Sequence, residues 1–301
     1  MRVAALDLGT NTTRLLVADV EDGRVDEVER RLEITRLGEG VDERRKLLPL
    51  PIARVRNVLS DYRRTLEELG AERALLVATS AVRDAENGEA FLGEIEWSYG
   101  FTTRLLSGDE EAELVRRGVA TGAELAPDTL ILDLGGGSTE LIVGDRHVSL
   151  DLGSVRMTER FGEDVDAIRA HVREELPPVE ASRAIGVAGT VTTIAALDLG
   201  LSEYDPERVH GHRIAREAVE RQLARLASLP LEERRRLPGL EPERAPVIVA
   251  GAAILAELLA AYGLDGVEAS ERDILDGAAL EAAALPEPEE GAAPPGAYTC
   301  C

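Results

Sequence analysis

The chain has 301 residues, of which 44% are hydrophobic, and it carries a formal net charge of −23. This is about twice the length of a typical single domain, so the sequence predicts two domains. The negative charge excludes an extended nucleic-acid-binding surface, because such a surface needs a dense array of Lys and Arg side chains. A polyphosphate-like ligand can bind only where metal ions and a few local arginines overcome the repulsion, since salt screens the overall field within about 10 Å.

Two features predict a cytoplasmic protein that does not enter a membrane. No apolar run reaches the roughly 20 residues of a membrane-spanning helix. Residues 1–9 pass into a strand pattern without the architecture of a signal peptide.

The two cysteines, Cys300 and Cys301, are adjacent at the C-terminus. We therefore expect no core disulfide and no Cys-based metal site, and thiol chemistry is excluded from the mechanism.

A hairpin-like motif occurs twice in the chain. Residues 6–17 align without gaps with residues 132–143, and this alignment matches Asp7 to Asp133. Each copy has an apolar run that ends in Asp, a short turn rich in Gly, Asn, Ser and Thr, and a second apolar run. This pattern is typical of a β-hairpin. The repeat predicts two similar halves.

Each half continues with further strands and then with helices. Strand patterns cover residues 24–34 and 147–152, and the helical period appears in residues 52–69 and 165–176. The sequence therefore predicts the α/β class.

Both turns have the composition of an anion-binding site. Glycines and small polar residues let successive backbone N–H groups converge on a phosphate, and nearby hydroxyls can add donors. The alternative is that any Gly-rich hairpin needs such residues for its turn. The residues predicted to bind phosphate here are Gly9, Thr10, Asn11, Thr12, Thr13, Gly135, Gly136, Gly137, Ser138 and Thr139.

Five segments together resemble one family. They are DLGTNTTRLL and DLGGGSTELIVG in the repeats, ATSAVRDAENG at 78–88, SGDEEAEL at 107–114 and GVAGTVTT at 186–193. In this order they resemble the exopolyphosphatase and guanosine pentaphosphate phosphohydrolase family, over about residues 1–285. The resemblance implies the superfold of actin, Hsp70 and the sugar kinases, with two ribonuclease-H-like domains flanking a cleft.

The resemblance also implies an activity, a cofactor and an assembly. The activity is removal of the terminal phosphate from inorganic polyphosphate, or from the 5′ end of the alarmone pppGpp. The cofactor is Mg²⁺, with Mn²⁺ as the other candidate, and the assembly is a homodimer. The two actin-like domains are expected at 1–121 and 122–285, with the option that the last helix packs back on the first domain. An acidic, Pro-, Gly- and Ala-rich tail at 286–301 is expected to be disordered.

Glu111 is the candidate general base. In the family motif, the second of the paired glutamates of SGDEEAEL activates the attacking water. The structural alternative is that Ser107 and Glu110 form a capping box at a helix N-terminus, where acidic residues are favourable in any case. Because Glu110 suffices for the box, Glu111 is left for catalysis.

The resemblance implies that further carboxylates bind the metal. Asp7 and Asp133 are expected to hold Mg²⁺, and Glu140 is expected to orient water or metal from the returning strand. The alternative for Glu140 is an ordinary exposed strand position.

Two arginines are candidates for phosphate binding, since guanidinium groups bind phosphate in a bidentate way. Arg83 follows a predicted strand at 74–78 and is assigned a catalytic role in neutralising phosphate charge. Arg14 lies in the returning strand of the first repeat, and the alternative for it is a solvated surface arginine.

Gly189 and Thr190 follow another apolar strand and open a helix, so their N–H groups can bind a further phosphate. The alternative is a tight strand-to-helix turn with Thr190 as the cap. His210 and His212 have a metal-like spacing, but without partner ligands we expect them to be loop histidines.

The chain departs from the family pattern in two places. Thr12 stands where many members carry Ser, which adds a methyl group to the turn. The sequence also ends where longer members add a large helical domain, so we expect a preference for short polyphosphates. Two other functions stay open, a kinase of the same superfold and a non-catalytic sensor of the alarmone or of polyphosphate.

Overall fold

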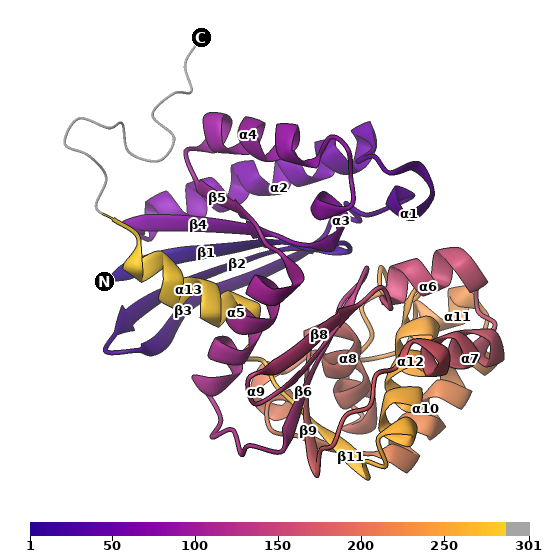
Figure 1. Cartoon of the computed structure of the whole chain (residues 1–301). Coiled ribbons are helices and arrows are strands. Elements are labelled where there is room, and N and C mark those ends of the chain that lie inside the picture. Colours follow the sequence, from indigo (N-terminus) through magenta and orange to yellow (C-terminus); the bar gives the residue numbers. More distant parts are fainter. Residues whose placement is uncertain (287–301) are drawn as a thin grey trace. The chain divides into compact units, whose positions relative to one another are not determined.

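The computed structural model describes residues 1–286. Within this range the chain forms two compact units, Met1–Ala123 with residues 272–286, and Glu124–Glu271. The first unit is thus built from two separate parts of the chain, and its second part includes the last helix (Figure 1). The segment predicted to be disordered lies, after Pro286, outside the described residues, as do both cysteines.

The first unit contains a five-stranded sheet with the order β3-β2-β1-β4-β5. The first three strands are antiparallel, and β1, β4 and β5 are parallel. The strands are β1 (Arg2–Leu8), β2 (Thr12–Glu21), β3 (Arg24–Ile34), β4 (Arg73–Ala78) and β5 (Thr102–Leu105).

Helices cover both faces of this sheet, so β1 is buried along almost its whole length. In Figure 1, α13 lies beside α5 across β1, β2 and β4, and α2 and α4 lie on the other face. The helices of the first unit are α1 (Val41–Arg44), α2 (Pro49–Glu68), α3 (Ser80–Arg83), α4 (Gly88–Tyr99), α5 (Gly108–Ala120) and α13 (Ile274–Ala284).

The second unit contains a six-stranded sheet with the order β10-β11-β9-β6-β7-β8. Its strands are β6 (Thr129–Leu134), β7 (Thr139–Val143), β8 (Arg146–Leu150), β9 (Arg183–Val187), β10 (Arg213–Ala215) and β11 (Gly266–Ala269). The strands β6, β7 and β8 are antiparallel, and β6, β9 and β11 are parallel.

The apolar helix α12 lies in the core of the second unit, where it packs against α6, α7, α8 and α10. The helix α8 also contacts β6 and β9. The helices of this unit are α6 (Ser154–Phe161), α7 (Val165–Glu175), α8 (Ala188–Asp198), α9 (Pro206–Val209), α10 (Arg216–Ser228), α11 (Leu231–Arg234) and α12 (Ile248–Ala261).

Both sheets share a core of five strands, in which three antiparallel strands are followed by two parallel ones, and the second sheet adds β10, which is antiparallel to β11. This confirms the predicted α/β class with two ribonuclease-H-like halves. The strand predicted at 24–34 is confirmed, because β3 begins and ends at these residues. The strand predicted at 147–152 is wrong at its ends, because the chain leaves the sheet after Leu150 and turns into α6. The helix predicted at 52–69 begins earlier, at Pro49, a favourable first residue of a helix.

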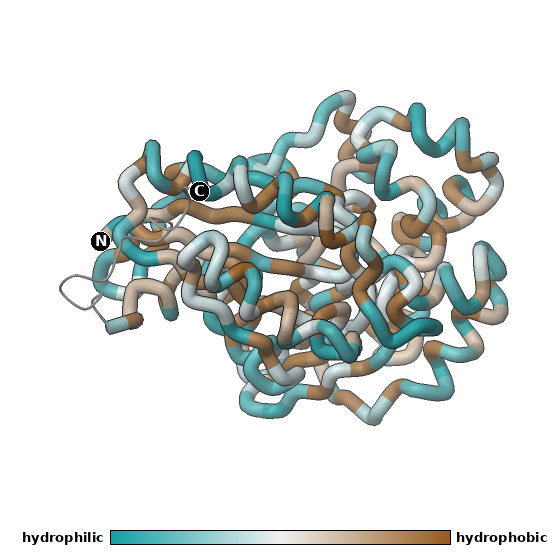
Figure 2. Tube along the Cα trace, turned by 90° about the horizontal axis from the view of Figure 1, so that it is seen from above, coloured by the Kyte–Doolittle hydropathy of each residue, from teal (hydrophilic) through white to brown (hydrophobic). Residues whose placement is uncertain are grey.

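Hydrophobic residues, brown in Figure 2, run along the inner strands and inner helix faces, and hydrophilic residues predominate on the outer helices. None of the helices within residues 1–286 combines the length and the hydropathy that crossing a membrane requires.

Candidate functional site

The two Asp-Leu-Gly motifs form hairpins with the same register. In the first unit Asp7 on β1 lies opposite Arg14 on β2. In the second unit Asp133 on β6 lies opposite Glu140 on β7. Residues that are directly opposite in antiparallel strands lie on the same face of the sheet with Cβ atoms about 5 Å apart. The repeat therefore keeps one backbone geometry but places a cation in one copy and an anion in the other.

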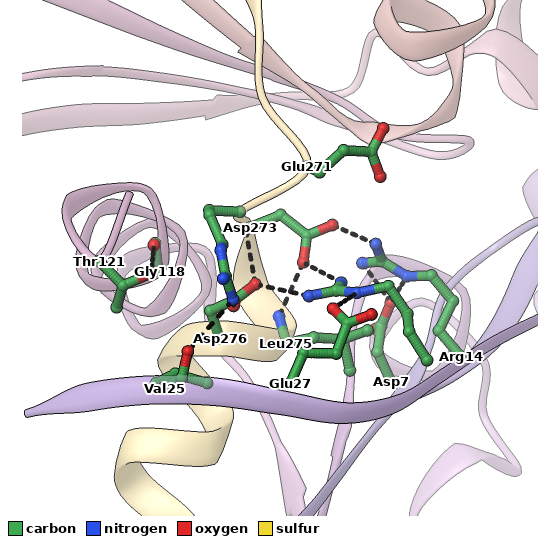
Figure 3. Close-up of polar contacts among 12 residues, drawn as sticks. Asp7, Arg14, Val25, Glu27, Gly118, Thr121, Glu271, Asp273, Leu275 and Asp276 are labelled. Atoms are coloured by element: carbon green, nitrogen blue, oxygen red, sulfur yellow. Dashed lines mark hydrogen bonds and ion pairs between the residues drawn. The ribbon is translucent and has the colours of Figure 1, made fainter. Parts of the chain in front are cut away.

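Arg14 is held between two carboxylates of the first unit (Figure 3). Its Nε and Nη2 atoms lie 2.9 and 2.7 Å from Oδ2 of Asp7, and its Nη1 atom is bonded to Asp273, the N-cap of α13. Only 15% of the Arg14 side chain is exposed, so the alternative of a solvated arginine is wrong. Burial raises the pKa of Asp7, and Arg14 limits that rise.

Asp273 is also part of a longer chain of charges that anchors α13. Arg30 on β3 lies 4.0 Å from Asp273 and donates to Asp276 over 3.1 Å. Arg272 donates to the other oxygen of Asp276 over 2.7 Å. Burial alone would raise the pKa of Asp273, but the charges of Arg14 and Arg30 hold it below its ordinary value.

Backbone N–H groups of the segment that follows β3 bind carbonyl groups of the first turn. The N–H group of Gly38 donates to the carbonyl of Thr10 over 2.8 Å, and that of Arg36 donates to the carbonyl of Asn11 over 2.9 Å. The hydroxyl of Thr10 is bonded to that of Ser80 over 2.8 Å. These bonds fix the direction in which the peptide groups of the turn point.

The hydroxyls of the matched residues Thr13 and Thr139 are both engaged inside the protein. Thr13 is bonded to Thr35 over 2.9 Å, and Thr139 donates to the carbonyl of Leu152. Both threonines are fully buried. The structure therefore does not present either hydroxyl as a donor for phosphate.

Arg83 and Glu111 form an ion pair in the first unit. Arg83 ends the short helix α3 and donates from Nη1 to Glu111 over 3.0 Å and to the carbonyl of Leu106 over 2.9 Å. The predicted capping box is confirmed, since Ser107 and Glu110 satisfy each other at the N-terminus of α5. The pKa of Glu110 is lowered by the N–H and hydroxyl of Ser107. Glu111, which the box does not use, is buried with an exposed fraction of 6%.

Asp133 and Glu140 lie side by side in the second unit and are 8% and 1% exposed. The hydroxyl of Ser149 on β8 donates to Glu140 over 2.8 Å. The alternative that Glu140 occupies an exposed strand position is therefore wrong. Within the second unit the structure thus brings together Asp133 and Glu140, both of which were predicted to bind the metal.

The second turn is supported by the N-terminus of α6. Its first N–H groups donate to the carbonyl of Gly135 over 3.0 Å and to that of Gly136 over 2.8 and 3.1 Å. Arg156, which is 7% exposed, donates from Nε to the carbonyl of Gly137 over 2.8 Å. All three glycine carbonyls are thus bound on the side of α6.

Gly189 and Thr190 lie in the first turn of α8, directly after β9. Because Val187 on β9 is paired with Asp133 on β6, this turn begins at the same edge of the sheet as the second hairpin turn. Thr190 lies inside the helix and Val187 is the N-cap, so the alternative of Thr190 as a cap is wrong. A Cβ on Gly189 would lie 1.7 Å from Nη1 of Arg244, so a side chain at this position would have to displace the end of that arginine.

The two histidines bind other side chains and backbone. His212 lies 2.9 Å from Asp198, and the ring of His210 accepts the N–H of Glu271. Within residues 1–286, no three His, Cys, Asp or Glu side chains are grouped as metal ligands. The sequence reasoning missed Asp273 and Arg156. The capping box of Asp273 and Asp276 marks only the start of a helix, and no local pattern shows that either Asp273 or Arg156 acts on a turn that is distant in sequence.

Comparisons with known proteins agree with the predicted family. The model of the Ppx/GppA phosphatase family matches residues 16–283. Exopolyphosphatase 2 of Mycobacterium tuberculosis is 38% identical, over 94% of this chain and 98% of its own length. A crystal structure of an exopolyphosphatase-like protein has a TM-score of 0.86 at 34% identity and covers 93% of this chain and 98% of its own.

A longer relative carries the other name that the motifs suggest. The guanosine-5′-triphosphate,3′-diphosphate pyrophosphatase of Vibrio vulnificus is 29% identical, over 92% of this chain and 58% of its own length. From the family model, the relatives and the shared fold together, this chain belongs to the Ppx/GppA phosphatase family.

Proposed function

We propose that this chain hydrolyses phosphoanhydride bonds and releases terminal orthophosphate from inorganic polyphosphate. The observation that carries the proposal is the second hairpin, where the buried carboxylates of Asp133 and Glu140 adjoin a turn whose glycine carbonyls are all bound on one side. The 38% identity to an exopolyphosphatase over almost the whole of both chains supports the choice of substrate.

The residues of the second hairpin suit a divalent cation. Mg²⁺ is usually bound through one or two carboxylates together with water and substrate phosphates, so it does not need a group of three protein ligands. Asp133 and Glu140 supply two adjacent, buried carboxylates. We propose that they hold Mg²⁺, which when bound would neutralise phosphate charge. Asp7 is less suited, because Oδ2 already accepts two bonds from Arg14.

We propose Glu111 as the general base. Phosphoanhydride hydrolysis has a loose transition state, so the protein mainly orients water and stabilises charge. Glu111 is fixed by the ion pair with Arg83 and by its place in the first turn of α5. In this role its carboxylate takes the proton of the attacking water. The guanidinium of Arg83, 28% exposed, supplies positive charge to the phosphate.

The runner-up substrate is pppGpp, in which the same bond type is broken. It is favoured by the similarity to the Vibrio vulnificus enzyme, which is however lower and covers 58% of that protein. We therefore rank polyphosphate first.

The test is phosphate release with Mg²⁺ from tripolyphosphate, long-chain polyphosphate, pppGpp and ATP, using the wild type, Glu111→Gln and Glu110→Gln. Glu110 is the matched control, because it is the adjacent glutamate and belongs to the capping box. We expect Glu111→Gln to lower kcat by about 10²-fold or more and Glu110→Gln to leave it within about twofold. Wild type that binds pppGpp but releases no phosphate from any substrate would favour the sensor, and turnover only with an added acceptor would favour the kinase.

A further inference from the structure

The support of the second turn by α6 determines where its N–H groups point. A trans peptide group is planar, so the N–H of each residue points opposite to the carbonyl of the residue before it. The described residues contain no cis peptide bond. The carbonyls of Gly135, Gly136 and Gly137 all point to α6 or to Arg156. The N–H groups of Gly136, Gly137 and Ser138 therefore all point away from α6.

These three N–H groups are consecutive and share one direction, which is the arrangement that binds an anion. Between residues 1 and 286, none of them donates to a backbone carbonyl. The helix backbone sets the first two peptide groups, but it does not reach the third. The carbonyl of Gly137 is held by the side chain of Arg156 instead.

We propose that Arg156 is a positioning residue for phosphate binding, which it serves by fixing the peptide group between Gly137 and Ser138. This inference rests on the proposed function, in which the second turn binds the substrate phosphate. Arg156 acts through the turn: its guanidinium binds the rear carbonyl, and the N–H of Ser138 on the opposite side binds the phosphate.

The surroundings of Arg156 suit this task. The side chain is 7% exposed, and its Nη2 atom lies 3.5 Å from Asp151, so the guanidinium is held at two ends. Gly153 lets α6 approach the turn closely. A Cβ on Gly153 would lie 2.2 Å from the carbonyl oxygen of Gly136. The absence of a side chain at Gly153 thus allows the backbone of α6 to bind the turn directly, and Arg156 binds the carbonyl that this backbone does not reach.

The experiment compares Arg156→Ala and Arg156→Lys with a matched control, Arg234→Ala. Arg234 is also a buried arginine of the second unit, is fully buried, and donates to a backbone carbonyl, that of Leu226. Two quantities are measured. The first is kcat and KM for phosphate release from tripolyphosphate with Mg²⁺, with and without added methylguanidinium. The second is the change in the amide ¹H–¹⁵N shifts of Gly136, Gly137 and Ser138 on titration with inorganic phosphate.

We expect Arg156→Ala to lower kcat by about 10²-fold, the typical effect of losing one backbone-type donor to a transition state. Methylguanidinium should restore part of this loss, and phosphate should bind at least tenfold more weakly with smaller shifts at Ser138. Arg234→Ala should lose thermal stability but keep both kcat and the phosphate-induced shifts. Arg156→Lys keeps the positive charge but lacks the planar Nε–H group. We expect it to lower both kcat and phosphate binding while the protein stays folded, even if Arg156→Ala fails to fold.

Two results would overturn the inference. One is phosphate binding and kcat within about twofold of wild type in both Arg156 variants. The other is the absence of any phosphate-induced shift at the three amides in wild type. If wild type releases no phosphate but its three amides respond to phosphate and lose that response in Arg156→Lys, the inference stands and the proposed function fails.

Discussion

The two hairpins share a register but treat charge in opposite ways. In the first unit each buried carboxylate near the turn has an arginine: Asp7 has Arg14, and Glu111 has Arg83. In the second unit Asp133 has a second carboxylate, Glu140, as its partner across the strands. Two adjacent buried carboxylates repel each other unless a cation lies near them. A duplicated hairpin can thus keep its backbone while it places an ion pair across the strands in one copy and two carboxylates in the other.

The supports behind the two turns differ as well. The first turn is held by N–H groups of an irregular segment, at Arg36 and Gly38. The second is held by a helix N-terminus and by one buried arginine. The backbone direction is therefore fixed in both copies, by different parts of the chain.

The largest effect expected from breaking this contrast comes from Glu140→Gln, which removes one charge of the carboxylate pair. We expect phosphate release to fall by about 10²- to 10³-fold, since the proposed metal loses a ligand. The metal-free variant should melt at a higher temperature than wild type because the repulsion is relieved, and Mg²⁺ should no longer raise its Tm. Calorimetry with and without Mg²⁺ measures both the difference in Tm between the metal-free proteins and the effect of Mg²⁺ on each Tm. A wild-type Tm that does not change when Mg²⁺ is added would contradict the metal assignment.

The second test removes a carboxylate from the ion pairs of the first hairpin. Asp273→Asn removes one of the two carboxylates that hold Arg14, and we expect a loss of about 3 kcal/mol in the free energy of unfolding at pH 7. The pKa of Asp273 is lowered in the folded state, so its contribution is complete above the unfolded value of about 3.9 and is lost as the pH falls through the folded value.

Urea unfolding at pH 7 and at decreasing pH measures this difference between wild type and Asp273→Asn. The control is Asp61→Asn, which removes an exposed partner of Arg64 on α2 and should change stability by less than about 1 kcal/mol. A loss at Asp273 that stays constant down to pH 2 would show that the charge is not its cause.

A third pair of variants compares the two supports. A Cβ on Gly153 would meet backbone atoms of Gly136 and Gly137 at 2.2 to 2.3 Å, whereas one on Gly38 would meet the methyl of Thr10 at 2.3 Å. We expect both Ala variants to lose about 1 to 3 kcal/mol, with the larger loss at Gly153 because backbone must move. Gly93→Ala is the control, since nothing lies within 4 Å and helix α4 should gain about 0.5 to 1 kcal/mol. Thermal denaturation ranks the three, and equal losses at Gly38 and Gly153 would argue against a stiffer second turn.

The smallest effect concerns the capping box that precedes Glu111. Glu110→Gln should cost less than about 1 kcal/mol at neutral pH. The pKa of Glu110 is lowered by Ser107, so this cost is complete above its ordinary pKa and should vanish as the pH falls through the lowered value. Melting curves of the two proteins over pH 2 to 7 test this, and a cost that grows toward acid pH would have the wrong sign.

The repeat alone predicted much of the fold. It predicted both hairpins, because each lies within one short stretch of the chain, whereas the direct pairing of Asp133 with Glu140 is a finding of the structure. The capping box was readable for the same reason, because Ser107 and Glu110 are neighbours in the chain. Local patterns of this kind depend only on backbone period and turn length.

The remaining parts of the site depend on contacts between distant segments. Nothing near Arg14 indicates that Asp273 holds it, since that contact exists only when α13 packs on β1 and β2. The ion pair between Arg83 and Glu111 likewise needs β4 and β5 to be adjacent. Arg156 lies in a helix whose fit to the turn depends on the missing side chain of Gly153. The sequence contains these residues, but only the packing shows what they touch.

The two-part construction of the first unit also bears on biosynthesis. The second unit is one continuous stretch, Glu124–Glu271, whereas the first requires residues from both ends of the described chain. During translation the second unit can therefore be completed before the first, although it begins later, because the first unit lacks α13 until Ile274–Ala284 has been made. Until then β1 and β2 expose the apolar surface that α13 covers.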